Sequence, residues 1–527
     1  MILIRNIKLQ PKEGESELLA KAAKKLRVKP ELIKDFKFVK KSLDARRKED
    51  IHYVCTIAAQ VAASEDKLIR QAKSADVAKY EPKGYEIPSV SSESRPLVVG
   101  FGPAGIFAAL VLAMAGAKPL VIERGQDALT RKAAVDHFLA TGKLDPDCNI
   151  QFGEGGAGTF SDGKLNTGVK DRRMDWMFSQ FVEHGAPKNI AYDAKPHIGT
   201  DILINIVQNI RKKIISLGGQ VLFGTKLERL VIENGAIVGA LVSDRNGLRC
   251  IDCTQVILAL GHSARDSFEM LLEEKIPMEP KAFSMGVRIE HLQKDINAAQ
   301  YGEASQDLPA ADYSLNVHLP DGTSAYSFCM CPGGHVIAAA SEREAVVTNG
   351  MSYSRRDSRN ANAALLVTLN VEDFPDRGVL SGMYWQREIE QRAFIKGGCN
   401  YHAPAQLVGD FLKGKASTSH ASVIPSYEPG VTWCDLHQVL PQRITSVLEK
   451  AIPELGKKLP GFDNEDAVMT APETRSSSPV RILRDEMLRS EVKGLYPCGE
   501  GAGYAGGISS AALDGMRCAE AVLRDIE

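Results

Sequence analysis

The chain has 527 residues, so at about 150 residues per domain it should fold as two to four domains. Hydrophobic residues make up 44% and charged residues 25% of the chain, which is typical of globular proteins and excludes a disordered or fibrous one. The net charge is −1, the ten cysteines are too dispersed for a disulfide framework, and no apolar run reaches the roughly 18 residues of a membrane span. Because the N-terminus also lacks the apolar core of a signal peptide, we expect a cytoplasmic protein.

The first 80 residues predict a small α+β module. Alternating apolar residues at 2–9, 36–40 and 53–61 predict strands, and the spacing at 16–26 predicts a helix. The module holds 19 Lys and Arg against 11 Asp and Glu, a local charge of +8. A basic module can bind nucleic acid, but here basic and acidic residues alternate and stacking aromatics are few, so a solvated surface is the favoured interpretation.

Residues 81–94 are rich in Pro, Gly and Ser and predict a linker. After it, the apolar run 96–99 predicts a buried parallel strand, 104–115 a helix and 120–123 a second strand, which together form one β-α-β unit. Short strands are expected between 220 and 259, and mixed strands and helices from about 280 to 460.

The loop 100–105 of this unit reads Gly-Phe-Gly-Pro-Ala-Gly. Gly100 permits the tight turn out of the strand, Gly102 lets the backbone approach a pyrophosphate, and Gly105 permits close packing of helix on strand. Pro103, whose fixed φ suits the first helical position, leads into the helix, and the free N–H groups of the first turn, from Ala104 on, can bind phosphates. The loop therefore predicts a dinucleotide site.

Glu123 ends the second strand, where a carboxylate can accept hydrogen bonds from ribose hydroxyls, and Arg124 beside it is a further candidate contact. The negative charge disfavours a 2′-phosphate, so FAD or NAD fits this site better than NADP. A solvated strand end is the alternative.

The C-terminal segment 495–515 runs from a short strand, through six glycines, into a helix of small residues. It resembles the C-terminal FAD signature of the glutathione-reductase-like flavoproteins, and this resemblance favours FAD over NAD. It implies that Glu500, where Asp is commoner, contacts the ribityl chain and that the helix N-terminus faces the N1–C2=O edge of the flavin, where negative charge gathers on reduction. The candidate contacts in this segment are Gly499, Glu500, Gly506, Gly507 and Ile508.

Three further segments extend the resemblance. Residues 256–261 are similar to a strand-then-Gly motif of the same superfamily, with Leu in place of its usual Thr, which adds Gly261. Residues 151–165 and 328–335 are similar to signatures of the NAD(FAD)-utilising, or FAD-dependent, dehydrogenases, most of which are uncharacterised. This resemblance covers nearly the whole chain and implies that Gly155, Gly156 and Ser161 contact FAD; a flexible surface loop is the alternative for 151–165.

Other polar residues give weaker signals. Cys329 and Cys331 share one face of an expected strand, but no further ligands complete a metal set, and we expect them to pack in the core. The polar residues that could anchor a substrate are each explained as well by a structural or solvated role, and they are His335, Arg355, Arg356, Arg359 and Arg475.

We therefore expect an α/β chain with a Rossmann-type FAD/NAD(P)-binding domain at 95–280 and 460–527, an inserted α+β substrate or cap domain at 281–459, and a small N-terminal α+β domain at 1–80. The expected activity is that of an FAD-dependent oxidoreductase that transfers a hydride between flavin and an organic small molecule. No second glycine fingerprint follows Gly105, so a nicotinamide nucleotide would enter only transiently at the flavin face. The alternative is a flavin-containing RNA-binding or RNA-modifying protein that uses the basic module.

Overall fold

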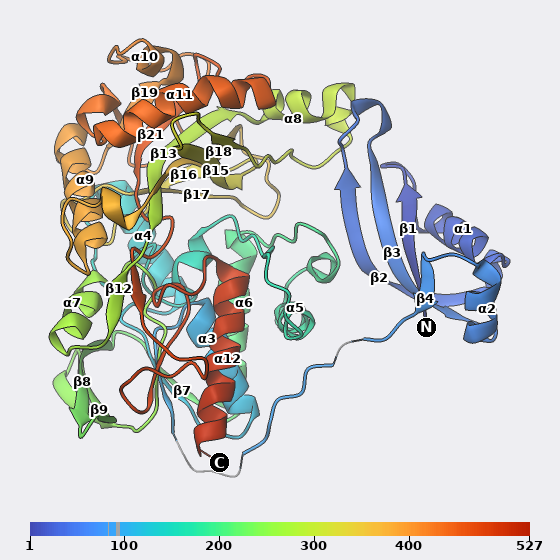
Figure 1. The fold of residues 1–527 in the computed structure, drawn as a ribbon, viewed down its shortest axis with the longest axis horizontal. Helices are drawn as coiled ribbons and strands as arrows, with labels where there is room; N and C mark the ends of the chain where they lie inside the picture. The colour runs from blue at the N-terminus through green and yellow to red at the C-terminus, as the bar shows by residue number, and fades with distance from the viewer. Residues whose placement is uncertain (83, 91–94, 527) are drawn as a thin grey trace.

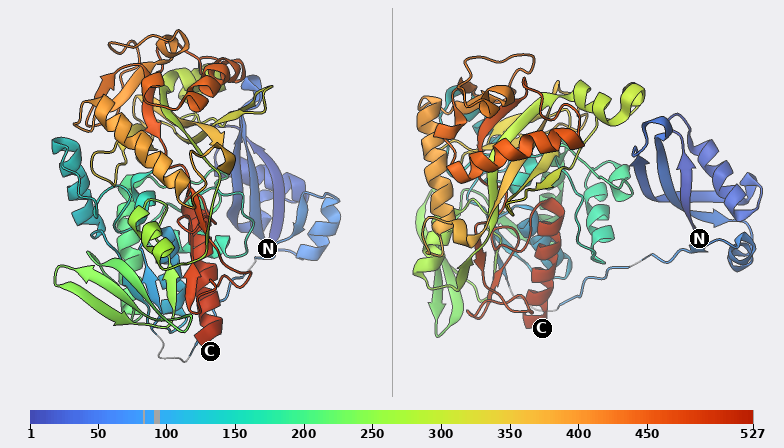
Figure 2. Two further views of the ribbon diagram at one scale, coloured as in Figure 1. Left: turned by 60° about the vertical axis from the view of Figure 1, so that its left-hand side comes forward. Right: turned by 45° about the horizontal axis from the view of Figure 1, so that its top comes forward.

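The computed structural model describes residues 1–82, 84–90 and 95–526; Lys83 and residues 91–94 of the expected linker, together with Glu527, lie outside the described residues. Figure 1 shows an N-terminal module beside a larger body, which consists of a parallel-sheet domain and an inserted domain above it. The two further views in Figure 2 show the module on one side of this body.

The N-terminal module is a four-stranded antiparallel sheet, in the order β2-β3-β1-β4, with two helices packed on it. Its elements are β1 (Ile2–Leu9), α1 (Glu15–Leu26), β2 (Ile33–Asp44), β3 (His52–Val61), α2 (Glu65–Ala72) and β4 (Val77–Lys79). Leu18 and Leu26 of α1 and Leu68 of α2 are buried against Ile4 and Ile57 of the sheet. Sequence patterns missed α2 and β4 because α2 buries only a narrow apolar stripe and β4 is three residues long.

The module is attached to the body through β2. The Lys41 N–H donates to the Tyr192 carbonyl (2.7 Å), and the Ala194 N–H donates to the Lys41 carbonyl (2.8 Å). The Phe38 ring stacks on Tyr192 with centroids 4.8 Å apart, and Ile51 lies in the hydrophobic core of the inserted domain. Phe38 of β2 is therefore packed against the larger body.

The described part of the expected linker is not free of the body. The Tyr85 hydroxyl donates to Glu520 Oε1 (2.8 Å), and its ring meets Trp176 edge to face at 5.4 Å. The Val90 N–H donates to the Ala115 carbonyl (2.9 Å). The linker sequence has no regular spacing of apolar residues, because Tyr85, Ile87 and Val90 pack individually against the parallel-sheet domain and do not form one face of a helix or strand.

The parallel-sheet domain is assembled from distant parts of the chain. Its five strands, in the order β23-β11-β5-β6-β7, are β5 (Leu97–Val99), β6 (Leu120–Ile122), β7 (Gln220–Leu222), β11 (Val256–Leu258) and β23 (Leu495–Pro497). One face is covered by α3 (Pro103–Met114), α6 (Thr200–Ser216) and α12 (Ile508–Ile526). The other face packs on a small antiparallel sheet of β8 (Lys226–Glu233), β9 (Ala236–Asp244) and β10 (Gly247–Asp252).

Helix α12, at the C-terminal end of the chain, lies against α3 near the start of the same domain (Figure 1). A Cβ at Gly515 would lie 2.0 Å from the Ala104 carbonyl oxygen, so glycine is required for this close approach. The remaining helices of the domain are α4 (Ala128–Thr141), α5 (Met174–Glu183) and α7 (Arg265–Glu273). The close packing brings the N-termini of α3 and α12 to the same edge of the sheet.

The inserted domain is built on a seven-stranded sheet in the order β14-β15-β18-β13-β21-β19-β20, antiparallel except for the β19–β20 pair. These strands are β13 (Phe283–Leu292), β14 (Asn316–His318), β15 (Ser324–Cys331), β18 (Asn360–Leu369), β19 (Ala403–Leu407), β20 (Val431–Trp433) and β21 (Val468–Glu473). Its helices are α8 (Gln293–Tyr301), α9 (Ser381–Gly397), α10 (Val408–Leu412) and α11 (Gln442–Lys458). A small pair, β16 (His335–Ala338) with β17 (Thr348–Met351), completes it. A second pair, β12 (Met278–Pro280) with β22 (Val480–Ile482), packs in the core of the parallel-sheet domain.

The end of the inserted domain lies later than the sequence predicted. We expected residues 460–527 to belong to the FAD-binding domain, but β21 pairs with β13 and β19 of the inserted sheet. An apolar, fully buried strand looks the same in either sheet, so the sequence alone could not assign it. The expected fold class is confirmed, with a Rossmann-type domain, an inserted α+β domain and a small N-terminal α+β domain. Among the described residues, no helix combines the length and apolarity needed to cross a membrane.

Candidate active site

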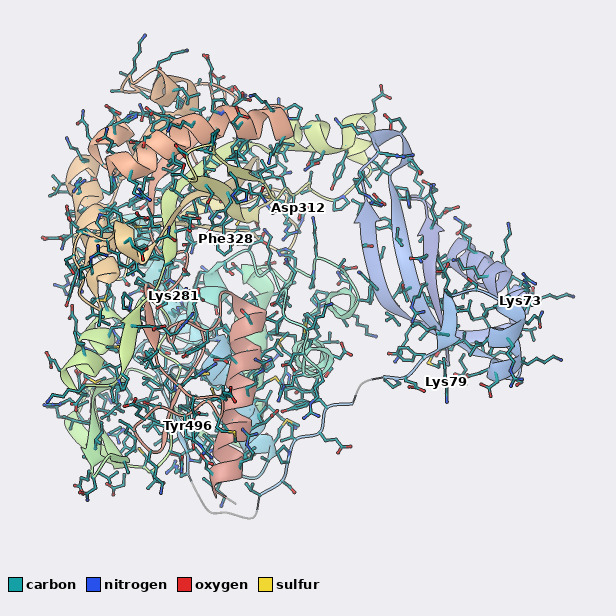
Figure 3. The ribbon with its side chains drawn as sticks, viewed as in Figure 1. Lys73, Lys79, Lys281, Asp312, Phe328 and Tyr496 are labelled. Atoms are coloured by element: carbon teal, nitrogen blue, oxygen red, sulfur yellow. The ribbon has the colours of Figure 1, made fainter. Side chains whose placement is uncertain are left out.

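A cavity of about 470 Å³ lies where the inserted domain meets the parallel-sheet domain. Its floor includes residues that follow β5, β6, β11 and β23, at the carboxyl ends of the parallel strands, which is where ligands bind in open α/β sheets. Asp312 and Phe328 of the inserted domain line its other side, and Figure 3 places both at the junction of the two domains.

The glycines of the loop 100–105 have different roles. Gly100 has a φ of 96°, and a Cβ there would lie 2.3 Å from the Ala259 carbonyl oxygen. A Cβ at Gly105 would lie 1.9 Å from the Gly100 carbonyl oxygen, so both glycines are required by the packing of the chain itself. A Cβ at Gly102 would meet nothing closer than Gly156 Cα, at 3.6 Å. Glycine at 102 is therefore explained by the cavity that it lines rather than by contacts within the chain.

Glu123 is buried at the end of β6 and organises the loops around the cavity. Its carboxylate accepts backbone N–H bonds from Phe101 (2.8 Å), Gly125 (2.9 Å) and Gly153 (2.9 Å). A carboxylate has about four acceptor positions, so three such bonds leave capacity for one more donor, such as a ribose hydroxyl. Glu123 thus has a structural role that the sequence did not reveal, in addition to a free edge on the cavity.

Arg124 closes the same end of the cavity. Its guanidinium forms a two-pronged ion pair with Asp266, with bonds of 3.1 and 2.9 Å, and lies over the Phe152 ring at 4.4 Å. These contacts hold the guanidinium plane in a fixed orientation, with one edge in the cavity wall.

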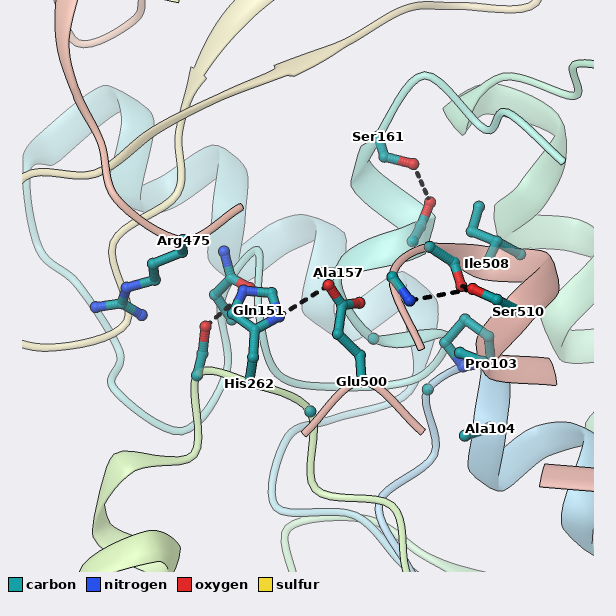
Figure 4. Close-up of a pocket in the computed structure, with 18 of the residues that line it drawn as sticks. Pro103, Ala104, Gln151, Ala157, Ser161, His262, Arg475, Glu500, Ile508 and Ser510 are labelled. Carbon is teal, nitrogen blue, oxygen red and sulfur yellow. Dashed lines mark hydrogen bonds and ion pairs between the residues drawn. The ribbon is translucent and has the colours of Figure 1, made fainter. Parts of the chain in front are cut away.

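The C-terminal glycine segment forms another part of the wall, and Figure 4 shows Ile508 and Ser510 beside Pro103 and Ala104. Gly506, Gly507 and Ile508 line the cavity at the N-terminus of α12. A Cβ on Gly506 or Gly507 would meet nothing within 4 Å, and Gly506 does not have a positive φ. The chain's own packing therefore leaves open the space beside Gly506, as expected of a backbone that approaches a ligand.

Glu500 and His262 face each other in the cavity, with Nδ1 of His262 3.5 Å from Oε1 of Glu500 (Figure 4). Burial raises the pKa of Glu500 from 4.5 to about 7, against the opposing effects of the Gly507 N–H and the Lys281 charge. Burial, and next the charges of Arg475 and Arg265, lower the pKa of His262 to about 4. At neutral pH the imidazole is therefore neutral, and the carboxyl group can take up or release a proton.

The structure brings most of the sequence-predicted site residues together. Those that line the cavity are Gly100, Gly102, Pro103, Ala104, Glu123, Arg124, Gly156, Ser161, Gly261, Glu500, Gly506, Gly507 and Ile508. The Ser161 hydroxyl donates to the Gly158 carbonyl (2.7 Å) and accepts from the Gly163 N–H (3.1 Å), so it is engaged within its own turn.

Three predicted contacts lie outside the cavity lining: Gly105, Gly155 and Gly499. The Gly155 N–H donates to the Phe101 carbonyl (2.8 Å), and a Cβ there would lie 1.8 Å from Thr159 Oγ1. The Gly499 N–H donates to Asp514 Oδ2 (2.7 Å). These glycines shape the loops behind the cavity. The sequence prediction included them because a glycine in the motif looks the same whether its backbone faces a ligand or another part of the chain.

The polar residues of the inserted segment separate into two groups. Arg356 and Arg475 line the cavity, whereas His335, Arg355 and Arg359 do not. Beneath the cavity, Arg265 and Arg475 both bind the carboxylate of Glu390, and all three side chains are buried. Burial alone would raise the pKa of Glu390, but the two guanidinium groups outweigh it and lower the pKa to about 2. This cluster joins α7 of the parallel-sheet domain to α9 of the inserted domain.

Sequence reasoning missed several cavity residues. His262 follows Gly261 directly, and its position after a strand-then-Gly motif was the available signal. Cys329, Glu473 and Lys164 also line the cavity, but they come from separate elements that only the tertiary fold brings together.

The donor set fits an extended dinucleotide. Helices α3 and α12 both begin at the cavity, and each helix N-terminus offers N–H groups and about half a positive charge to an anionic or electron-rich group. The open space at Gly102 and Gly506 lies beside these two helix ends. One cavity therefore combines two helix N-termini with open space beside each of them.

Comparison with known proteins identifies two family models and one related chain. Residues 282–476 match the family model "FAD-dependent protein, C-terminal domain-like", and residues 1–60 match a domain of unknown function, DUF8436. An uncharacterised protein of Clostridium beijerinckii is 46% identical over 536 residues, which cover 100% of this chain and 99% of that protein.

Solved structures share less. A mutant of Escherichia coli quinol fumarate reductase is 12% identical, with a TM-score of 0.37 over 82% of this chain and 69% of that one. Glycerol-3-phosphate dehydrogenase from Bacillus halodurans, complexed with FAD, is 12% identical, with a TM-score of 0.35 over 83% of this chain and 64% of that one. Likeness at this level gives no information on substrate.

Proposed function

This chain belongs to the same family as the Clostridium beijerinckii protein, and from that premise we propose that it is an FAD-dependent oxidoreductase that transfers a hydride between the flavin and an organic small molecule. The observation that carries the proposal is that the N-termini of α3 and α12 both face the same cavity. Beside them, Gly102 and Gly506 leave space that no other part of the described chain fills. The family model over residues 282–476 supports FAD as the cofactor.

In this proposal, different residues along the cavity bind the pyrophosphate, the ribose and the flavin ring. At one end of the cavity, the backbone N–H groups of Gly102 and Ala104 would bind the pyrophosphate, Pro103 would begin α3 beside it without an N–H of its own, and Glu123 would accept a bond from the ribose. The N-terminus of α12, at Ile508, would stabilise negative charge at the flavin N1–C2=O edge by about 0.3–2 kcal/mol. When bound, FAD supplies the hydride chemistry at its N5 position.

Proton transfer falls to groups of the protein. Glu500 lies in the same cavity and titrates near pH 7, so it can donate a proton to a substrate or accept one from it. Reduction of a carbon–carbon double bond and oxidation of an alcohol or amine both need such a group. Nicotinamide nucleotides enter transiently at the flavin face in this scheme and have no binding domain of their own.

The test is a screen of metabolites under anaerobic conditions that follows the flavin absorbance of the purified protein. A substrate that donates hydride bleaches the absorbance, and an acceptor restores the colour of the reduced protein. Glu500→Gln should slow the reaction of any substrate found, most strongly above pH 7 where the carboxylate accepts a proton from the substrate and most strongly below pH 7 where the carboxyl group donates one. A protein whose flavin is neither bleached nor reoxidised by any organic compound, but which binds RNA in a salt-dependent manner through residues 1–80, would contradict the proposal and favour the RNA-binding alternative.

A further inference from the structure

Cys329 and Cys331 occupy an irregular end of β15. The pairing of β15 with β18 shifts register between Phe328 and Cys331, and Cys329 has a φ of 41°, in the left-handed region. Cys329 lines the cavity and is partly exposed, whereas Cys331 is fully buried directly behind it, with its Sγ 3.2 Å from the Cys329 carbonyl oxygen. The two thiols therefore form a pair with one member in the cavity and one in the core, contrary to our expectation that both simply pack.

A buried cation lies against this pair. Arg288 of β13 is fully buried; its guanidinium donates to the Cys329 carbonyl (2.7 Å) and contacts Cys331 Sγ at 3.2 Å. The same group donates to Oε1 of Glu473 (3.0 Å). Its positive charge lowers the pKa of both thiols and so favours the thiolate, the reactive form in thiol–disulfide chemistry, but at Cys331 burial outweighs this effect.

Glu473 is the adjacent acid. It is buried at the end of β21, lines the cavity, and its Oε2 has no hydrogen-bond partner among the residues that the structure describes. Burial raises the pKa of Glu473 to about 7, against the opposing charge of Arg288. A buried carboxyl group with a free oxygen at this position can exchange a proton with a neighbouring group.

The two thiols differ in acidity. The hydrogen bond from Cys331 lowers the pKa of Cys329 to about 6, helped by Lys164 and Arg288 and opposed by burial and by Asp162. Burial, and next the interaction with Cys329, raise the pKa of Cys331 well above its ordinary value. One thiolate and one thiol side by side is the ionisation state from which a dithiol reacts with an electron acceptor.

We propose that Cys329 and Cys331 are a redox-active dithiol that exchanges two electrons with the flavin in the shared cavity, an inference that rests on the proposed function. In the oxidising direction the Cys329 thiolate and the Cys331 thiol form one S–S bond, and the S–H bond of Cys331 breaks. The pair loses two electrons and one proton; oxidised flavin takes up the electrons, and Glu473 is placed to receive the proton. In the reverse direction reduced flavin returns two electrons, one proton returns to the sulfur of Cys331, and the disulfide opens to a thiolate and a thiol.

The first experiment counts electrons. The full-length protein carrying FAD is oxidised and then titrated with dithionite under anaerobic conditions. The proposal predicts four electrons per chain, two for FAD and two for the disulfide, and two electrons for Cys331→Ser. Cys250→Ser, at an exposed cysteine on β10, is the matched control and should still take four. Wild-type protein that takes only two electrons per FAD would overturn the dithiol proposal and leave the proposed function intact.

A second measurement does not depend on a variant that folds. Free thiols are alkylated before and after flavin-mediated oxidation. The number of alkyl groups on the peptide that contains Cys329 and Cys331 is then determined by mass spectrometry. The proposal predicts that both thiols are alkylated in the reduced protein and that neither is alkylated in the oxidised protein. Full alkylation of both after oxidation would overturn it. Protein that does not bind FAD would overturn the proposed function as well, so the two failures are distinguishable.

Discussion

Replacing Gly102 by glutamate places a carboxylate where the backbone should approach the FAD pyrophosphate. The chain itself leaves ordinary van der Waals space for a Cβ at this position, 3.6 Å from Gly156 Cα, so the first side-chain atom does not clash. A carboxylate about 4 Å from a phosphate charge is repelled by about 4 kcal/mol at an effective dielectric constant of about 20. That corresponds to an FAD affinity weaker by about a thousandfold.

The assay is the ratio of FAD to protein after purification, together with thermal unfolding in the presence of added FAD. Gly102→Glu should be colourless and should lose the ligand-linked stabilisation, about 2.7 kcal/mol when FAD is at about 100 times its dissociation constant. Gly168→Glu is the matched control, because Gly168 is exposed, has nothing within 4 Å of its Cβ position and has no positive φ. Gly116 would be a poor control, since its φ is 98° and a Cβ there would lie 3.0 Å from the Val90 carbonyl oxygen. If Gly102→Glu purifies with a full complement of FAD, the loop 100–105 is not the phosphate site.

Three further outcomes are expected. A chain that starts at Gly84 keeps the contacts of Tyr85 and should remain yellow, because every residue that lines the cavity follows it; a folded but colourless product would show that the N-terminal module is needed for FAD binding. The pKa of Glu500 is raised from 4.5 to about 7, so the folded state binds this proton more tightly than the unfolded state. The free energy of unfolding of the flavin-free protein should therefore fall by about 3 kcal/mol relative to that of Glu500→Gln as the pH rises from 4.5 to 7. The same pH dependence in both proteins would contradict this. Glu390→Gln removes the buried carboxylate that Arg265 and Arg475 share and leaves them only the more exposed Glu342, so it should cost about 3–5 kcal/mol in chemical denaturation. Glu388→Gln, at an exposed pair, should cost about 0–1 kcal/mol, and equal costs would refute the role of the buried cluster.

The part of the site that local sequence can specify was predictable. A strand, a glycine loop and a helix are contiguous at 97–114, and the positive φ of Gly100 and the contact of Gly105 with the Gly100 carbonyl are local demands. Gly507, which directly precedes α12, likewise has a positive φ of 121°. Such positions can be predicted from one sequence because backbone geometry restricts the residue type.

The far side of the cavity was not predictable in this way. Cys329, Glu473 and Arg288 lie on three different strands, and only the order β15-β18-β13-β21 brings them together. Neither the long-range register nor the bulge at Cys329 leaves a local pattern in the sequence. The same limit applies to β21, whose apolar residues are equally compatible with the parallel sheet or with the inserted one.

Whether the cavity binds FAD is decided by the identity and amount of the flavin that the full-length protein carries. Heat denaturation should release about one FAD per chain, and the flavin-free protein should regain FAD with a shift in its absorbance spectrum and a rise in its unfolding temperature. A full-length, folded protein that releases no flavin and takes up none when FAD is supplied would contradict the account.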